Sequence, residues 1–430
     1  MKLVFIYSQL SLGGVETLIV RLANWLVHEG HQISLILIKK GPLDNLLSDK
    51  VNLIYINKSI SFFKPYMLGN LIKNSFFENT DVVFSFDPMS LWMSLLCQQS
   101  FDKNTRFWTG VFHPRIYFFE KKDRITLKLE RRAFLKNIPD KSKSFMNDAT
   151  RLSHEKFFKK KFLQSMILPI PLIDNGIRKS IPKKFLIVSV GRLTAFKTYN
   201  LYMIDVVSSL ISKGFNVQWD IYGYGELEIQ MIEKIEKLGL SNLIKIHGAL
   251  PYEDMHSRLE NAYVFIGMGT ALIEAGFYGI PVIPAIEREG PFTYGYLYNL
   301  PEFTVGERLE YEPNCSIEEM LVDLFSLTED QYKIECKKNR DYCNMYNIDV
   351  IGKRLVDSID SLGTLKNIDM ATKLFFWLYY GAVLVRQVFI VNNHFAIKIA
   401  KKILPAKITS FLRRWNRKRL CKSSMASQEL

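Results

Sequence analysis

The chain has 430 residues, of which 48% are hydrophobic and 23% are charged, and its formal net charge is +14. This length accommodates two domains and an additional segment, and this composition excludes an intrinsically disordered protein. The five cysteines are scattered and lack metal-ligand spacing, which favours a reducing compartment and argues against a zinc site.

The positive charge is concentrated in two segments. Residues 370–430 contain 12 Lys and Arg against one acidic residue, and residues 115–161 contain 15 against 6. Because the rest of the chain is mildly acidic, the two segments favour one anionic partner surface. Nucleic acid and anionic lipid both fit, and charge alone does not choose between them.

The first half of the chain alternates strand-like and helix-like runs. Residues 1–8 have an apolar run that is too short for a secretory signal and predicts a buried strand. Gly13 and Gly14 follow, and apolar residues then recur at helical spacing from Val15 to Leu26. Further strands are expected at 32–38, 51–56, 81–86 and 106–112. A strand, a Gly-Gly loop, a helix and a strand are typical of a Rossmann-like domain, although the glycine pair alone fits a tight turn equally well.

The strand expected at 106–112 ends in His113, before a proline. Residues 115–162 interleave Phe and Tyr with Lys and Arg, which suits a lipid interface; a solvated helix face with some packed aromatic residues is the alternative. Pro169-Ile170-Pro171 and the polar stretch 174–184 make the best domain boundary in the chain.

Two stretches of the second half predict a ligand site. The buried strand expected at 185–190 is followed by Gly191, Arg192 and, five residues further on, Lys197, which places two cations where α/β sheets bind ligands. The strand expected at 263–266 is followed by a second stretch, in which Gly267 and Gly269 let a backbone approach a ligand and Thr270 is a plausible cap for a helix that carries Glu274. Backbone N–H groups at such a helix start, those of Thr270 and Ala271, favour a phosphate. Together these residues indicate a site for a nucleotide diphosphate.

Strands and helices continue to alternate through this half. We expect strands at 217–222, 243–247 and 279–283, and helices at 201–211, 226–238 and 316–366. Gly223 and Gly225 follow one of these strands, and as an isolated pattern they indicate a turn.

The two stretches that predict this ligand site resemble the donor site of glycosyltransferase family 4. The members of this family are retaining enzymes of the GT-B architecture and belong to the glycosyl transferases group 1. The family carries Gly-Arg…Lys and then Glu-x7-Glu around Gly-Phe-Gly. Here Gly267-Met268-Gly269 stands at Gly-Phe-Gly and Glu274 at the second Glu, whereas Ile266 replaces the first Glu. The resemblance covers about residues 1–366.

The resemblance implies roles for individual residues. Arg192 and Lys197 would hold the diphosphate, and Glu274 would hold the ribose. His113 stands where the family has a histidine that contacts the donor sugar, and Gly13-Gly14 where it has a loop over donor and acceptor. Gly223 matches a Gly-x-Gly-Pro region imperfectly. No Asp-x-Asp motif precedes the donor stretch, in agreement with a reaction that needs no metal or other cofactor.

The C-terminal tail contains two apolar segments. Residues 374–391 are interrupted by Arg386, and a charge near the centre of a membrane span costs about 2.5–3.5 kcal/mol on insertion scales. An interfacial segment is therefore favoured over a transmembrane helix. Residues 404–419 have the pattern of a basic amphipathic helix in an anionic interface, and a solvated tail is the alternative.

We therefore expect an α/β protein of two Rossmann-like doubly wound domains that face a central cleft. The expected parts are an acceptor domain (1–170), a donor domain (171–344), a helix that crosses back (345–366) and a membrane-associating tail (367–430). The expected activity is transfer from a UDP- or GDP-sugar to a lipid-linked saccharide in bacterial capsule, O-antigen or exopolysaccharide synthesis, at the inner face of the cytoplasmic membrane. A non-catalytic nucleotide-sugar-binding subunit is the alternative. Nucleic acid is not expected as a partner, because the basic residues are interleaved with long apolar runs and no recognition module is present.

Overall fold

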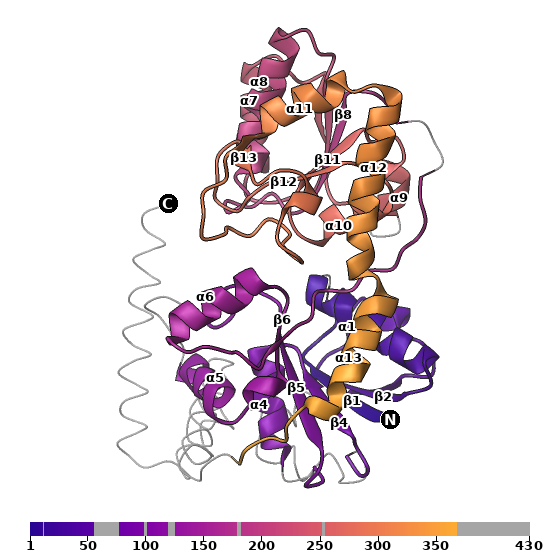
Figure 1. Cartoon of the computed structure of the whole chain (residues 1–430), viewed down its shortest axis with the longest axis vertical. Coiled ribbons are helices and arrows are strands. Elements are labelled where there is room, and N and C mark those ends of the chain that lie inside the picture. The colour runs from indigo at the N-terminus through magenta and orange to yellow at the C-terminus, as the bar shows by residue number, and fades with distance from the viewer. Residues whose placement is uncertain are drawn as a thin grey trace, which may run out of the picture.

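The computed structural model describes residues 1–11, 13–55, 77–98, 101–118, 125–178, 182–251 and 254–367. Figure 1 shows two α/β domains stacked along the long axis of the molecule, with the N-terminus in one of them. The tail segments 374–391 and 404–419 lie outside the described residues, as do the aromatic and basic residues 119–124.

The first domain is built on a parallel sheet with the strand order β3-β2-β1-β4-β5-β6-β7. The strands are β1 (Lys2–Tyr7), β2 (Gln32–Leu37), β3 (Asn52–Tyr55), β4 (Val82–Ser85), β5 (Arg106–Val111), β6 (Lys143–Phe145) and β7 (Met166–Ile167). The central strands are buried along nearly their whole length, as expected where helices cover both faces of a parallel sheet. The order reverses between β1 and β4, the place where doubly wound sheets open to a ligand.

The helices of the first domain are α1 (Gly14–His28), α4 (Pro88–Leu96), α5 (Ile125–Lys136) and α6 (Asp148–Phe158). Asp87 starts α4 through a capping box with Ser90, and Pro88 occupies the first turn, where a missing N–H does no harm. Asn147 starts α6 by accepting a hydrogen bond from the Thr150 N–H at 2.8 Å.

The second domain has a smaller parallel sheet with the order β10-β9-β8-β11-β12. Its strands are β8 (Leu186–Val190), β9 (Gln218–Tyr222), β10 (Ile244–Ile246), β11 (Val264–Gly267) and β12 (Val282–Pro284), and a short antiparallel pair comprises β13 (Phe292–Thr293) and β14 (Cys315–Ser316). Its helices are α7 (Tyr199–Ser212), α8 (Glu228–Lys237), α9 (Met255–Leu259), α10 (Thr270–Phe277), α11 (Ile317–Ser326) and α12 (Glu329–Cys343). Here the order reverses between β8 and β11.

The last helix, α13 (Ile348–Ser358), crosses back and packs on α1 of the first domain (Figure 1). The indole Nε1 of Trp25 donates to Asp349 Oδ1 at 2.8 Å. Gly352 lies so close to the same indole that a Cβ atom there would be 2.5 Å from the ring. The two crossings between the domains run side by side, since Leu172 N donates to Tyr346 O at 2.8 Å and Ile348 N donates to Leu172 O at 2.9 Å.

Candidate functional site

The predicted donor site lies at the carboxyl ends of β8 and β11, which are neighbours in the second sheet. The hydroxyl of Ser189 donates to the carbonyl of Ile266 at 2.6 Å and joins the two strand ends. The Tyr199 hydroxyl lies beneath both loops, 3.8 Å from a Cβ position on Gly191 and 3.7 Å from one on Gly267. The two glycine-containing stretches are therefore adjacent, at the point where the strand order reverses.

The Arg192 loop is held in place by the end of β9. Gly191 N donates to Tyr222 O at 2.9 Å, and Leu193 N donates to Tyr224 O at 3.0 Å. A Cβ atom on Gly223 would be 1.9 Å from the carbonyl oxygen of Gly191, so only glycine fits there. Gly223 thus supports the loop through close backbone packing.

Arg192 and Lys197 place two positive charges at this loop. The Lys197 side chain is half-buried and folds over Gly191, with Nζ 2.6 Å from the Cβ position of that glycine. Burial and, to a smaller extent, the charge of Arg192 lower the pKa of Lys197 to about 8. Within the described part of the chain, neither side chain has a hydrogen bond or ion pair. Two such cations form a site for an anion.

The start of α10 adds backbone donors. Gly269, with φ +85, is the N-cap residue and has no side-chain cap, so the expectation that Thr270 caps this helix is wrong. A left-handed backbone at this position favours glycine. The N–H of Gly269 donates to Val305 O at 2.8 Å, whereas those of Thr270 and Ala271 have no acceptor among the described residues. Two free amides at a helix N-terminus favour a phosphate.

The two positions of the Glu-x7-Glu pattern differ in their surroundings. Ile266 is fully buried in β11, within the apolar cluster between the sheet and its helices. Glu274, on α10, is also buried, and its Oε1 accepts a hydrogen bond from Nη2 of Arg21 at 3.2 Å. Arg21 belongs to helix α1, so the carboxylate expected to hold the ribose has a cationic partner in the opposite domain.

His113 follows β5 and faces the second domain. Its Nδ1 accepts the N–H of Arg115 at 3.0 Å, which leaves Nε2 as the nitrogen that can donate. Lost hydration lowers the pKa of His113, the charges of Arg115 and Arg192 lower it further, and Glu287 opposes them. Since Arg192 and Glu287 come from the second domain, the fold brings His113 within the electrostatic range of Arg192.

Gly13 and Gly14 lie at the start of α1, with Gly13 as the N-cap residue. Both are exposed. Their nearest described neighbours are the Glu16 carboxylate and the side chain of Ile170, where Cβ atoms would meet them at 2.4 and 3.5 Å respectively. The described contacts place this loop at the domain boundary without joining it to Arg192 or Lys197.

Residues 174–291 match the family model described as glycosyl transferases group 1. This match covers the part of the chain that contains β8 to β12. The amylovoran biosynthesis glycosyltransferase AmsK of Erwinia amylovora is 29% identical to the chain over 119 residues. The aligned part is 25% of this chain and 29% of AmsK, so the chain matches less than a third of that relative's length.

Solved structures resemble both domains of the chain. TarM of S. aureus superposes with a TM-score of 0.63 at 12% identity and covers 84% of this chain and 98% of its own. HepE of Anabaena, solved in complex with UDP, superposes with a TM-score of 0.63 at 15% identity and covers 84% of this chain and 100% of its own. The expected GT-B fold of two parallel-sheet α/β domains is confirmed.

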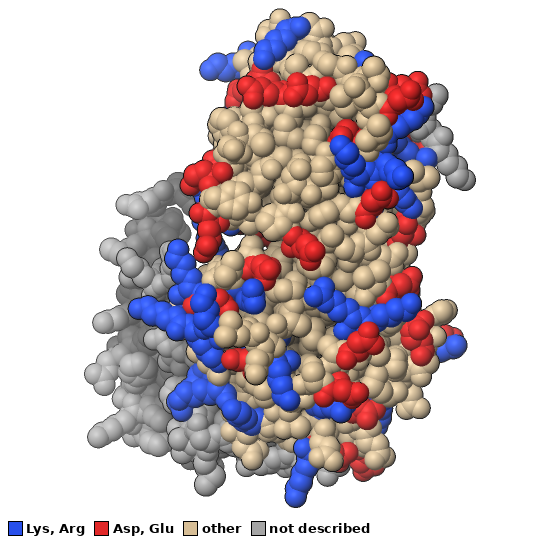
Figure 2. All heavy atoms as spheres, in the orientation of Figure 1, with Lys and Arg blue, Asp and Glu red and all other residues tan. Residues whose placement is uncertain are grey.

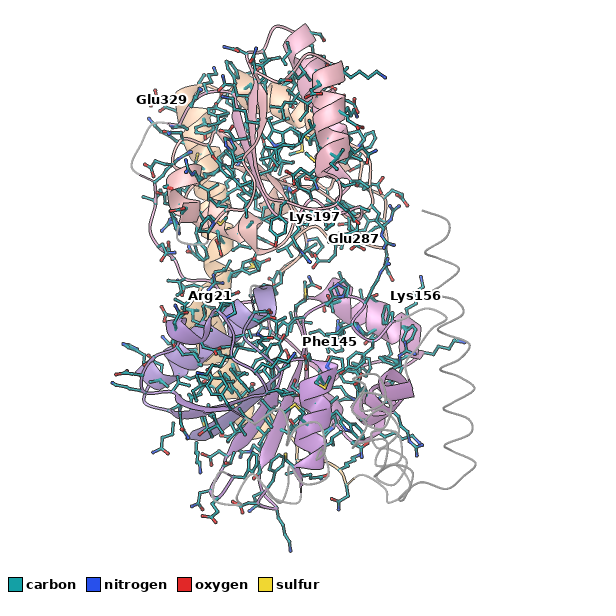
Figure 3. All side chains as sticks on the ribbon, turned by 180° about the vertical axis from the view of Figure 1, so that it is seen from behind. Arg21, Phe145, Lys156, Lys197, Glu287 and Glu329 are labelled. Carbon is teal, nitrogen blue, oxygen red and sulfur yellow. The ribbon has the colours of Figure 1, made fainter. Side chains whose placement is uncertain are left out.

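Two further charged residues lie near the predicted site, Glu287 of the second domain and Arg21 of the first. Glu287, just beyond β12, approaches Arg115 of the first domain at 3.9 Å. Figure 3 shows Lys197 and Glu287 on the side of the second domain that faces the first, and Arg21 on the facing side of the first. In the sequence, Arg21 is a charge within the apolar stripe of a helix and Glu274 stands in a recognisable stretch, but nothing there indicates that these two residues, 253 positions apart, form a pair.

Among the described residues, no group of three or more His, Cys, Asp or Glu side chains is arranged to hold a metal ion. Across the same residues, every helix falls short of the length and hydropathy that a membrane span requires.

Proposed function

We propose that the protein is a retaining glycosyltransferase that moves a hexosyl group from a UDP- or GDP-sugar to a lipid-linked saccharide. One observation carries the proposal: two cations without partners in the described part of the chain lie beside two free helix amides, at adjacent strand ends. HepE, which has the same fold, was solved in complex with UDP, and this supports a nucleotide as the ligand.

In the proposed reaction, departure of the nucleoside diphosphate builds negative charge on its β-phosphate. Arg192, Lys197 and the amides of Thr270 and Ala271 stabilise that charge, and preorganised donors of this kind lower the barrier most where charge develops. His113 donates through Nε2 to the sugar, and Glu274 accepts from the ribose hydroxyls. This donor set supplies the positive charge from the protein, so the proposed reaction needs no metal ion.

The proposal is tested by thermal unfolding with a panel of nucleoside diphosphates and nucleotide sugars. A ligand at 100 times its Kd stabilises the folded state by about 2.7 kcal/mol. We expect one base, uracil or guanine, to raise Tm by several degrees, and a chelator to leave transfer unchanged. A panel in which no nucleotide raises Tm would contradict the site, and a strict requirement for Mg²⁺ would contradict the mechanism.

The acceptor is proposed to be a lipid-linked saccharide because the first domain has a basic and aromatic surface. Figure 2 shows Lys and Arg side chains gathered over its α5–α6 side. The exposed cations there are Arg132, Lys136, Lys156, Lys159 and Lys161. Phe157 is 42% and Leu163 is 80% exposed beside them. Such a surface suits peripheral binding to an anionic membrane on its cytoplasmic face, and AmsK supports a role in polysaccharide synthesis.

A non-catalytic nucleotide-sugar-binding subunit is a second candidate, and Ile266 favours it. This side chain is fully buried where the family has the Glu that touches the donor sugar. A donor panel separates the two functions. Binding without hydrolysis or transfer, also in the presence of a membrane extract that contains lipid-linked saccharides, would favour the subunit.

A further inference from the structure

Arg21 joins three parts of the molecule at the boundary between the domains. It lies on α1 of the first domain, and its Nη1 donates to the carbonyl of Pro171 at 3.1 Å, in the crossing between the domains. Its Nη2 donates to Oε1 of Glu274 on α10 at 3.2 Å. The two side chains of the ion pair are only 7% and 8% exposed.

Burial makes this ion pair sensitive to change. Leu18 and Leu22 of α1 and Ile273 of α10 are fully or almost fully buried in the same apolar cluster. In such surroundings charges interact strongly, and removal of one partner leaves an uncompensated charge. The guanidinium also offers a planar fork of donors, which fixes a carboxylate in orientation as well as in position.

Glu274 lies close to the amides proposed to bind the diphosphate of the nucleotide. It follows Thr270 by four residues on α10, so the two residues lie on the same face of the helix, about one turn (~5.4 Å) apart. Thr270 carries one of the free amides proposed to bind the diphosphate. A ribose attached to that diphosphate therefore lies over the next turn, where Glu274 is.

We propose that Arg21 is a positioning residue for the nucleotide: it orients the Glu274 carboxylate toward the ribose hydroxyls from the opposite domain. This inference rests on the proposed function, in which Glu274 holds the ribose. It makes nucleotide affinity depend on a side chain of the first domain. The competing explanation is that Arg21 only holds the two domains together. In that case, its loss would affect ligands with and without ribose equally.

The test compares UDP, which contains the ribose, with inorganic pyrophosphate, which does not. Isothermal titration of Arg21→Met should show a Kd for UDP at least about tenfold higher than that of the wild type, with the Kd for pyrophosphate unchanged. Glu274→Gln should show the same selective loss. Arg21→Lys, which keeps the charge but not the planar fork, should show a smaller loss of UDP affinity and serves as the test variant if Arg21→Met does not fold.

Asn147→Ser is the matched control, because Asn147 makes a different contact between the domains. Its Nδ2 donates to Glu307 Oε1 at 2.8 Å and to Phe303 O at 3.0 Å, and serine retains the ability to cap α6. This variant should bind UDP as the wild type does. Wild-type UDP affinity in the Arg21 variants, or an equal loss for UDP and pyrophosphate, would overturn the inference. A wild-type protein that binds none of UDP, GDP and pyrophosphate would instead refute the proposed function and the inference with it.

Discussion

Lys197 carries the charge that is most easily lost from the proposed site. Its pKa is lowered to about 8 by burial and by Arg192, so the side chain is cationic below pH 8 and neutral above it. The diphosphate of UDP does not ionise further between pH 8 and 10. We therefore expect the Kd for UDP, measured by titration calorimetry, to rise by up to about tenfold per pH unit above pH 8.

Lys197→Arg is the control for this pH dependence, because its guanidinium stays charged throughout the range. It should bind UDP with a nearly constant Kd from pH 7 to 9, below the pH at which the uracil N3–H ionises. A wild-type Kd that is equally constant would show that Lys197 is not the titrating cation.

The same lysine should oppose folding in the absence of ligand. Its pKa is lower in the folded than in the unfolded chain, so the unfolded chain binds more protons between pH 8 and about pH 10.5, and the stability of the free protein rises with pH in that interval. Lys197→Met should therefore raise Tm at pH 7 while abolishing transfer.

Arg192→Ala should abolish transfer without loss of the fold. Near-normal turnover in both variants would contradict the mechanism.

The conformation of the loop after β8 depends on close packing against the loop after β9. Gly223→Ala would place a Cβ atom 1.9 Å from Gly191 O, so the Arg192 loop must move. We expect a lower Tm and at least tenfold weaker binding of UDP. Gly290→Ala, where a Cβ atom meets nothing within 4 Å, should leave both quantities unchanged. Normal UDP binding by Gly223→Ala would mean that this packing does not hold the cations in place.

The elements that the sequence predicts well are those with a strong local signal. Strands β8 and β11 are continuous apolar runs and lie where they are expected. By itself Asp87-Pro88 fits an ordinary turn, whereas the structure uses these two residues as the cap and the first residue of helix α4. Strand β6 has only three residues and begins with a buried lysine, Lys143.

Some features of the fold depend on tertiary contacts, which a local sequence pattern does not contain. Lys143 is tolerated in β6 because Asp140 pairs with it at 2.6 Å and the rings of Phe134 and Phe162 lie beside its Nζ. The candidate site likewise combines residues with a local signal and a contact without one. Arg192, Lys197 and Glu274 stand in recognisable stretches, whereas the pairing of Glu274 with Arg21 depends on how the two domains meet.

For the whole molecule, the strongest prediction concerns residues 368–430. Residues 363–367 belong to the folded part: Gly363 O accepts from Phe107 N at 2.9 Å, and Asn137 Nδ2 donates to Asn367 O at 3.0 Å. A chain truncated after Asn367 should therefore keep its Tm. We expect it to float less with vesicles that contain phosphatidylglycerol, because it keeps the α5–α6 surface but lacks the predicted amphipathic segment.

Unchanged flotation of the truncated chain would contradict the assignment of membrane binding to the tail and would transfer it to the α5–α6 surface. Oligonucleotide mobility-shift assays of the full chain should show no binding at physiological salt, in keeping with basic residues that alternate with apolar ones.

The paired crossings at Leu172 and Ile348 restrict how the two halves can move. Two chain segments pass between the domains, and main-chain hydrogen bonds tie them together at one point. A twist about the line of these segments leaves those bonds intact, whereas pulling the halves apart breaks them. We therefore expect the domains to rotate about these paired crossings when a donor enters or a nucleoside diphosphate leaves. The Arg21–Glu274 contact near Pro171 lies close to this axis, where a rotation displaces atoms least.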